Sequence, residues 1–410
     1  MISQIYLFNE GSAAAIYGIG TYIRQMVAIL SSCEDIRLTV VQSMCVDVKE
    51  YSVEELDGYR QVRVPQIKLL RSEKDFVRYY RNLWRLLRQT VEPDVPAIFH
   101  FNYHQEYPLV NHIRADLPKS HFCFTIHYQM WCFALQGNVR QYKEILHKKP
   151  DSLLSAEKKV RMEYDRERML FEAVDSVICL SGFTQKLIEE EYGIPSRKIH
   201  RISNGIKDDF VSLTPEERLS LRRKLFFDDD EKIILFVGRL DSGKGLEFLI
   251  HAFARVNEQV KSRLVIVGDG NTPVFQKAGK GYWNRITFTG RLEKEDLYAF
   301  YRVADVGVMP SFHEQCSYVA IEMLMMDVPL VLTDAPGLGE MQPDSVSRIP
   351  VCEEDGKCFV REEELADAIL QRLTKPTTLQ GRTDFLNRYA YANMEKTYLD
   401  FYARIMKEKG

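Results

Sequence analysis

The chain has 410 residues, which predicts two domains, because a single hydrophobic core seldom extends over so long a sequence. Apolar residues make up 45% and charged residues 28%, a composition that excludes a disordered or fibrous protein. The formal net charge of −3 argues against a nucleic-acid binder, and no apolar run is long enough to cross a bilayer.

The start of the chain and the cysteines point to a reducing compartment. Residues 1–8 lack the basic leader of a signal peptide and read as a strand. The eight cysteines are dispersed without a C-x-x-C pair, and Cys123 and Cys179 lie inside apolar runs. Buried reduced thiols explain this pattern better than disulfides or a zinc site, so we expect a cytoplasmic protein.

Short apolar runs alternate with helical patterns through most of the chain. Such runs suit parallel strands that are buried on both faces, and the pattern occurs twice, which predicts an α/β fold with two similar halves. The expected strands, in chain order, are Ile2 to Phe8, Leu38 to Val41, Ala97 to Phe101, Phe122 to Ile126, Ser176 to Leu180, Ile233 to Val237, Leu264 to Val267, Ile286 to Phe288, Val306 to Met309 and Leu330 to Leu332.

The two halves meet in a turn-rich stretch, residues 202–209. We therefore predict a first domain over 1–205 and a second over 206–385. The segment 386–410 has helical spacing and is expected to form a helix that packs back on the first domain.

The loop after the sixth expected strand has the spacing of a phosphate cradle. It reads Gly238-Arg239-Leu-Asp-Ser-Gly243-Lys244-Gly245, close to a Walker A motif. That motif needs Ser or Thr after the lysine to hold magnesium, and here the residue is Gly245. Arg239 and Lys244 can reach one anion through charged hydrogen bonds. Two surface cations in a turn remain the alternative interpretation.

A second loop leads into a helix that could bind an anion at its start. Glu314 is followed by Gln315, Cys316 and Ser317, and the helix is expected over 318–326. A helix N-terminus offers unpaired N–H groups and the positive end of its dipole. Glu322 lies inside this largely apolar helix, so two carboxylates could hold two sets of hydroxyls. The alternative is that Glu314 caps the helix and Glu322 faces solvent.

In combination, these motifs resemble the retaining glycosyltransferases of family four (group 1), which have the GT-B fold. The carriers are Phe236-Val-Gly-Arg239-Leu-x3-Lys244-Gly245, Val267-Gly-Asp-Gly270, Pro310-Ser-x2-Glu314-x7-Glu322 and, in the first half, Gly18-x-Gly20-Thr-Tyr22, Thr125-Ile-His127 and Ser203-Asn-Gly-Ile206. The resemblance covers nearly the whole chain and implies an α/β fold of two Rossmann-like doubly wound domains that face each other across a cleft.

The resemblance also implies roles for individual residues. Arg239 and Lys244 would bind the diphosphate of a nucleotide sugar, Glu314 the hydroxyls of the transferred sugar, and Glu322 the ribose. His127 would lie at the sugar or acceptor end. Gly18 and Gly20 would let the backbone approach the β-phosphate. Many relatives have Gly-Phe-Gly where this chain has Gln315-Cys316-Ser317, a departure at the phosphate loop.

The implied reaction is transfer of a hexosyl-type unit from a UDP- or GDP-linked donor, with retention, in glycan, glycolipid or glycopeptide biosynthesis. Cations and a helix dipole would stabilise the leaving diphosphate. The run Asp228-Asp229-Asp230 contains a D-x-D pattern but reads as a solvated loop, so no metal or cofactor is expected. A nucleotide-sugar epimerase and a non-catalytic GT-B subunit remain alternatives.

The acceptor side of the sequence is less informative. Ser72 to Asp75 predicts a helix start, and the following helix, residues 73–89, carries Arg78, Arg81, Arg85 and Arg88. A basic amphipathic helix fits peripheral contact with the inner face of a membrane, and equally a solvated face over the core. Trp131 and Phe133 fit either a stacking wall for a sugar or core packing. The expected acceptor is a glycan, a lipid-linked glycan or a peptide.

Overall fold

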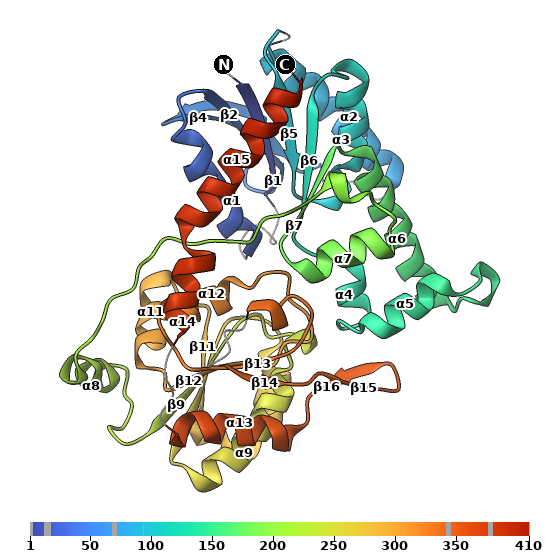
Figure 1. The fold of residues 1–410 in the computed structure, drawn as a ribbon. Helices are drawn as coiled ribbons and strands as arrows, with labels where there is room; N and C mark the ends of the chain where they lie inside the picture. The colour runs from blue at the N-terminus through green and yellow to red at the C-terminus, as the bar shows by residue number, and fades with distance from the viewer. Residues whose placement is uncertain are drawn as a thin grey trace. The chain divides into compact units, whose positions relative to one another are not determined.

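The computed structural model describes residues 3–11, 18–67, 72–92, 94–341, 346–375 and 380–409. The chain forms two compact units (Figure 1). The first unit contains Met1–Gln129, Lys149–Asn204 and Tyr391–Gly410, and the second contains Met130–Lys148 and Gly205–Ala390. The expected first domain, 1–205, thus differs in one substantial respect, because residues 130–148 group with the second unit.

The first unit is built on an eight-stranded sheet of order β3-β4-β2-β1-β5-β6-β7-β8. All its neighbouring strands are parallel except β3, which is antiparallel to β4. From β1 the chain builds outward to one side and then returns to start the other side at β5, so the switch point lies between β1 and β5. The strands are β1 (Ser3–Glu10), β2 (Ile36–Cys45), β3 (Ser52–Leu56), β4 (Tyr59–Pro65), β5 (Ala97–Phe101), β6 (His121–Ile126), β7 (Ser176–Cys179) and β8 (Ile199–Arg201).

The helices of this unit begin at sequence signals that can be read locally. Ser72 and Asp75 form the predicted capping box, with Asp75 N–H donating to Ser72 Oγ at 3.3 Å and Ser72 N–H donating to Asp75 Oδ2 at 3.0 Å. The helices are α1 (Gly18–Ser31), α2 (Glu73–Leu87), α3 (Tyr107–Asp116), α6 (Ser155–Ala173), α7 (Gly182–Glu190) and α15 (Tyr391–Lys409).

The C-terminal helix α15 is fixed to the first unit by buried hydroxyl groups. Tyr398 Oη lies 2.8 Å from Tyr22 Oη on α1, and Tyr402 Oη lies 2.5 Å from His100 Nδ1 on β5. The other ring nitrogen of His100 is 2.7 Å from Thr125 Oγ1. His100 is fully buried in this network, so it is a structural residue.

The second unit contains a six-stranded parallel sheet of order β11-β10-β9-β12-β13-β14, the order of a Rossmann domain. Its switch point lies between β9 and β12. The strands are β9 (Lys232–Val237), β10 (Ser262–Val267), β11 (Ile286–Gly290), β12 (Val306–Met309), β13 (Leu330–Thr333) and β14 (Ser347–Ile349), with a separate antiparallel hairpin of β15 (Cys352–Glu354) and β16 (Lys357–Phe359).

Helices cover this sheet and bury a continuous core. The helix α9 packs against α13, and both contribute apolar side chains to the core below β9 and β12, including Leu249, Phe253 and Ile369 (Figure 1). The helices are α4 (Met130–Ala134), α5 (Val139–His147), α8 (Pro215–Lys224), α9 (Leu246–Gln259), α10 (Thr272–Ala278), α11 (Lys294–Val303), α12 (Tyr318–Met325), α13 (Glu362–Thr374) and α14 (Gly381–Asp384).

Every strand predicted from the sequence overlaps an observed strand, so the α/β prediction with two doubly wound halves is confirmed. The prediction missed β3, β4, β8, β14 and the β15–β16 hairpin. Five of these six strands are short or exposed: β8, β14, β15 and β16 have three residues each, and in β3 four of five residues are exposed. A strand without buried apolar residues gives no periodic signal.

Candidate functional site

Two loops of the second unit meet at the switch point of its sheet. One follows β9 and the other follows β12, and these strands are neighbours. The Phe312 N–H donates to the carbonyl oxygen of Gly243 at 3.0 Å, which joins the two loops directly. Ligands of doubly wound sheets bind at this position, outside the carboxyl ends of the strands.

Gly245 shows why the sequence departs from a Walker A motif. Its φ is +63°, in the left-handed region that favours glycine, and a Cβ there would lie 2.1 Å from the carbonyl oxygen of Pro310. A serine or threonine would therefore clash with the neighbouring loop. The close approach of the two loops thus requires a residue that cannot hold magnesium.

Lys244 and Glu314 face each other from the two loops. Lys244 belongs to the short helical turn Ser242–Lys244, and its Nζ lies 2.5 Å from Glu314 Oε1. Their side chains are 20% and 13% exposed, so the pair is largely shielded from water. The backbone of Glu314 is held as well, since its N–H donates to Pro336 O at 3.0 Å. The structure therefore brings together one cation and one carboxylate that the sequence had assigned to the same ligand.

Arg239 lies in the same loop as Lys244 and is more exposed. Its Nη2 is 3.2 Å from Asp241 Oδ2, and Asp241 Oδ1 accepts the N–H of Gly243 at 3.0 Å. Both side chains of the Arg239–Asp241 pair are 41% exposed. The guanidinium therefore stays close to the turn and can exchange its carboxylate for another anion.

The helix α12 begins where the second loop ends. Ser317 is its N-cap, with Ser317 Oγ accepting the N–H of Ala320 at 3.4 Å. Gln315, Cys316 and Ser317 are all more than 90% buried. Their side chains pack inward, so any ligand at this helix start would meet backbone groups rather than these three side chains. The helix ends at Met325, one residue before the predicted end.

Glu322 projects from α12 into a partly buried position. The hydroxyl of Tyr301 on α11 donates to Glu322 Oε2 at 2.8 Å. Burial raises the pKa of Glu322 to about 7, and the bond from Tyr301 opposes that shift only in part. The interpretation that Glu322 simply faces solvent is therefore wrong.

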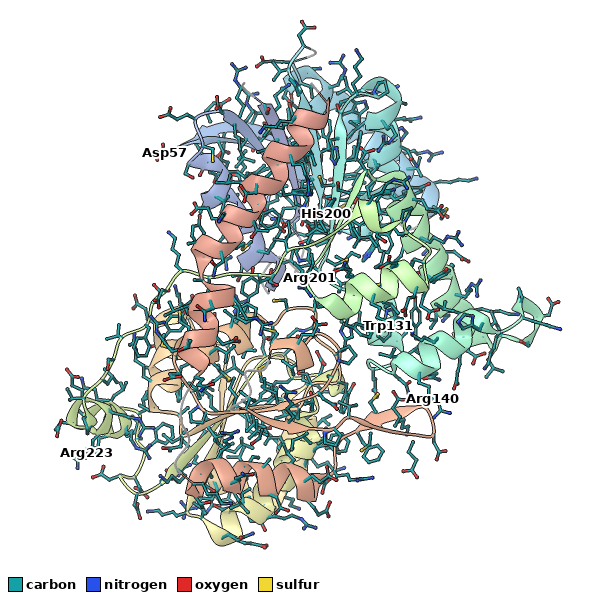
Figure 2. The ribbon with its side chains drawn as sticks, viewed as in Figure 1. Asp57, Trp131, Arg140, His200, Arg201 and Arg223 are labelled. Atoms are coloured by element: carbon teal, nitrogen blue, oxygen red, sulfur yellow. The ribbon has the colours of Figure 1, made fainter. Side chains whose placement is uncertain are left out.

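The segment Met130–Lys148 packs on the loop that carries Glu314, which sequence reasoning missed. Trp131 on α4 is 2% exposed and stacks on Tyr142 of α5, with ring centroids 4.7 Å apart. The His313 and Trp131 rings pack edge to face, with ring centroids 5.2 Å apart, and His313 Nε2 lies 3.4 Å from Cys132 Sγ. Trp131 and Arg140 are labelled on this segment in Figure 2. Trp131 is thus a core residue of the second unit.

The same segment also contacts the loop after β9. Gln136 Nε2 donates to Ser242 Oγ at 3.0 Å, and the guanidinium carbon of Arg239 lies 5.7 Å from the centroid of the Phe133 ring. Phe133 is 52% exposed, so its ring is available to a ligand beside Arg239. Residues from the first half of the chain thus complete the surroundings of both loops.

His313 is neutral in these surroundings. Burial lowers its pKa to about 3, and the nearby positive charge of Lys244 acts in the same direction. In the sequence, the only sign that His313 lies at this site is that it directly precedes Glu314.

In the first unit, the residues assigned to a ligand follow β1 and β6 in the chain. His127 follows β6, and its Nε2 is 2.9 Å from Oδ1 of Asn102, which follows β5. Gly18 is the first residue of α1, and Gly20 is buried in its first turn. Residues 12–17, which precede this helix, lie outside the described part of the chain.

The acidic run predicted as a solvated loop is engaged in surface ion pairs. Asp228 and Asp230 each pair with Lys261, at 2.9 and 2.7 Å, and Asp229 pairs with Arg223 at 2.5 Å. Among the described residues, no group of three or more His, Cys, Asp or Glu side chains could hold a metal ion. None of the eight cysteines, all of which lie in the described ranges, forms a disulfide.

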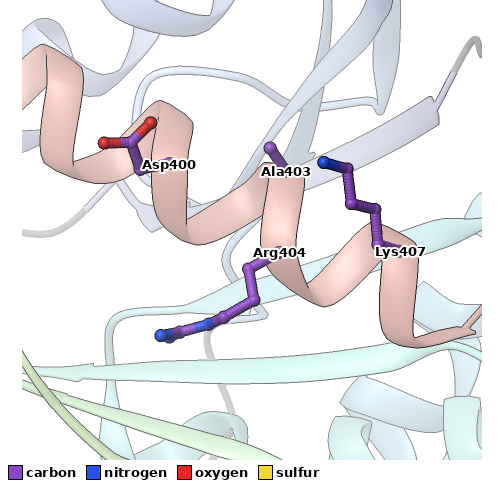
Figure 3. A pocket seen from close by; sticks show the side chains of 4 residues that line it. All are labelled: Asp400, Ala403, Arg404 and Lys407. Carbon is purple, nitrogen blue, oxygen red and sulfur yellow. The ribbon is translucent and has the colours of Figure 1, made fainter.

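Two further findings concern surfaces and helices outside this site. A solvent-open hollow of about 390 Å³ lies along α15, lined by Asp400, Ala403, Arg404 and Lys407 (Figure 3), and shares no residue with either set of loops. None of the helices in the described ranges combines the length and apolar character needed to span a membrane.

Two family models match the chain. The model described as Glycosyltransferase Family 4 matches residues 16–210, and the model for glycosyl transferases group 1 matches residues 231–375. An uncharacterized glycosyltransferase of Methanocaldococcus jannaschii is 30% identical over 241 residues, which cover 57% of this chain and 61% of that protein. The alpha-D-kanosaminyltransferase of Streptomyces kanamyceticus is 28% identical over 214 residues, covering 51% and 54%. The chain thus matches little more than half the length of these relatives.

Solved structures are similar over nearly the whole chain. Sucrose-phosphate synthase from Thermosynechococcus elongatus has a TM-score of 0.75 at 20% identity, covering 99% of this chain and all of that one. The HepE protein of Anabaena, solved with UDP and glucose, has a TM-score of 0.68 at 14% identity, covering 98% and 100%. These similarities establish a GT-B fold of two Rossmann-like domains.

Proposed function

We propose that the chain is a glycosyltransferase, because two glycosyltransferase family models match it and its fold is GT-B, and that it transfers a hexosyl-type unit from a UDP- or GDP-linked sugar to an acceptor with retention of anomeric configuration. The contact between Lys244 and Glu314 carries this proposal. A cation for phosphate and a carboxylate for hydroxyls, in contact across two loops, suit a ligand in which a sugar is bonded to a diphosphate. UDP in the Anabaena structure supports a uridine donor.

The chemistry follows from charge that develops on the leaving diphosphate. As the glycosidic bond breaks, negative charge grows on the phosphate oxygens, and Arg239, Lys244 and the start of α12 would stabilise it. Glu314 would orient the sugar and Glu322 the ribose. No residue is needed as a metal ligand, because the two cations supply the positive charge.

The first unit would supply the acceptor side. His127 would contact the sugar or acceptor, and Gly18 and Gly20 would permit backbone approach to the β-phosphate. The acceptor would be a glycan, a lipid-linked glycan or a peptide.

Ligand binding gives the first test, because a ligand that binds only the folded state raises its stability. UDP, GDP and their sugar conjugates are screened by thermal shift against wild type and the double variant Arg239→Ala with Lys244→Ala. The matched control is Arg223→Ala with Lys261→Ala, which removes two cations from surface pairs of the same unit. We expect a shift in wild type and control only. A shift retained by the Arg239–Lys244 variant would contradict the proposal.

Product analysis separates the reaction types. With an anomerically pure donor and a panel of acceptors, NMR of the product should show retained configuration. Activity should survive excess EDTA, and loss that manganese restores would overturn the metal-free mechanism. Epimerised donor without transfer would assign the chain to the epimerases, and nucleotide binding without turnover would assign it to a non-catalytic subunit.

Location and membrane contact form the last part of the proposal. A cytoplasmic protein with peripheral contact at the inner face would use α2, on which Arg78, Arg81 and Arg85 are exposed. The apolar residues of α2, including Tyr80, Leu83 and Leu87, are buried in the first unit, so the contact would be electrostatic. Sedimentation with anionic liposomes should then be weakened by salt, and absence of binding at low salt would remove the membrane from the proposal.

A further inference from the structure

Asn102 holds one ring nitrogen of His127 in a defined hydrogen-bonding role. Asn102 is 1% exposed and follows β5. Its Nδ2 donates to the carbonyl oxygen of Phe8 at 2.8 Å, and its Oδ1 lies 2.9 Å from His127 Nε2. A carbonyl oxygen can only accept, so the bond to Phe8 fixes the NH2 group on that side. The oxygen must then face His127.

This orientation determines the tautomer of His127. Because Asn102 Oδ1 is an acceptor, His127 Nε2 must carry the hydrogen and donate it. We propose that Asn102 is a positioning residue that holds neutral His127 as the Nε2–H tautomer and thereby presents its Nδ1 lone pair to a substrate hydroxyl. The proposal rests on the proposed function only for the identity of that substrate, a sugar.

The surroundings of His127 favour the neutral ring. The ring centroids of Tyr22 and His127 are 4.5 Å apart, and the two ring planes make an angle of 66°. The Tyr22 hydroxyl is itself held by hydrogen bonds with the hydroxyl groups of Thr125 and Tyr398. Burial lowers the pKa of His127 to about 3, and the nearby His100 and His104 act in the same direction. Within the described ranges, Asn102 is the hydrogen-bond partner of the ring, and Nδ1 has none. His127 would therefore accept a hydrogen bond and would not donate a proton from Nδ1 at neutral pH.

The tautomer can be measured without any substrate. Protein with ¹⁵N-labelled histidines is examined by two-bond ¹⁵N–¹H correlation NMR, with the His127 signals assigned by their loss in His127→Gln. We expect the Nε2–H pattern with no titration between pH 5.5 and 8. His251, whose side chain is 39% exposed on α9, provides an internal reference in the same spectra. A protonated Nδ1 in the neutral ring would overturn the proposal.

Two variants of Asn102 test the positioning role. Asn102→Asp keeps the size and adds a negative charge beside Nε2, so His127 should titrate at a higher pH than in wild type. Asn102→Leu removes the acceptor and should give mixed tautomers. An unchanged His127 spectrum in both variants, with folding checked by circular dichroism, would show that Asn102 does not set the tautomer.

Kinetics link the tautomer to the substrate. In Asn102→Leu, kcat/KM should fall about 10- to 100-fold, because a well-placed hydrogen bond to the substrate is lost or misaligned. In Asn102→Asp, activity should be low at acidic pH and recover as the pH rises and His127 loses its proton. Unchanged kcat/KM in a variant with altered tautomers would overturn the substrate contact. If no donor is turned over by wild type, the proposed function fails while the NMR result stands.

Discussion

The contact between Lys244 and Glu314 is an ion pair that the proposed diphosphate and sugar would have to rearrange. At 2.5 Å and with both side chains mostly shielded, the carboxylate neutralises the lysine before a ligand arrives. The phosphate of the proposed donor would therefore compete with Glu314 for the same ammonium group. Glu314 would favour an intact donor, whose hydroxyls engage the carboxylate, over a free nucleoside diphosphate.

Replacing Glu314 by glutamine should separate these two effects. We expect Glu314→Gln to bind nucleoside diphosphate more tightly, by about fivefold or more, because the phosphate no longer has to break an ion pair, and even a solvent-exposed pair contributes roughly 0.2–1 kcal/mol. Transfer should slow by about 10- to 100-fold, because a hydrogen bond to a charged group contributes about 1.5–3 kcal/mol. Isothermal titration and initial rates measure both. The exposed Glu295→Gln on α11 is the control, and weaker diphosphate binding in Glu314→Gln would contradict the competition.

The pKa of Glu322, raised by burial to about 7, predicts a pH dependence near neutrality. If the carboxylate accepts the ribose hydroxyls, nucleotide affinity should rise as the pH increases from 6 to 8 and become flat in Glu322→Gln. Since the folded-state pKa lies above the unfolded value, the folded state binds more protons between about pH 4.5 and 7. This group therefore costs stability as the pH rises through that window. Titration calorimetry measures nucleotide affinity at several pH values, and denaturation measures stability at the same values. If affinity depends on pH equally in wild type and Glu322→Gln, Glu322 does not bind the ribose.

At the scale of elements, the N-cap of α12 should matter for binding as well as for stability. Ser317→Ala removes the oxygen that accepts Ala320 N–H, which should cost about 0.5–2 kcal/mol of unfolding free energy. Ser181→Ala removes the corresponding cap of α7 in the first unit, where Ser181 Oγ accepts Thr184 N–H at 3.2 Å. Both variants should lose stability in urea, but only Ser317→Ala should weaken nucleotide binding. Equal binding in the two would show that the start of α12 does not contact the ligand.

The elements that the sequence predicted are those with a local signal. The run of β6 is apolar and fully buried, and the capping box at Ser72 and Asp75 is four residues long, so each is visible in one short window. That Lys244 and Glu314 lie close together could also be inferred from the sequence, because the carboxyl ends of parallel strands share one edge of a sheet. The contact of Cys132 with His313 joins residues 181 positions apart, and no local pattern reports such a distance.

At the scale of the whole molecule, the segment Met130–Lys148 should respond to nucleotide although it is remote in sequence from the loops after β9 and β12. Gln136 and Phe133 contact Ser242 and Arg239, so fixing that loop should slow amide hydrogen exchange in residues 130–137 as well. Hydrogen exchange with mass spectrometry, with and without UDP or GDP, measures this. The exposed strand β3 in the first unit is the reference. Protection confined to the loops after β9 and β12 would contradict the coupling.

The chain passes between the two units four times, after Gln129, Lys148, Asn204 and Ala390. A chimera made by joining the first half of this chain to the second half of a relative at residue 204 would therefore mismatch both units internally, because residues 391–410 of the first unit would come from the relative and residues 130–148 of the second would not. It would place a foreign His313 equivalent against the native Trp131, and a foreign Ser242 equivalent against the native Gln136. A chimera should therefore acquire the donor preference of the relative only when residues 130–148 are taken from the same relative as the second half.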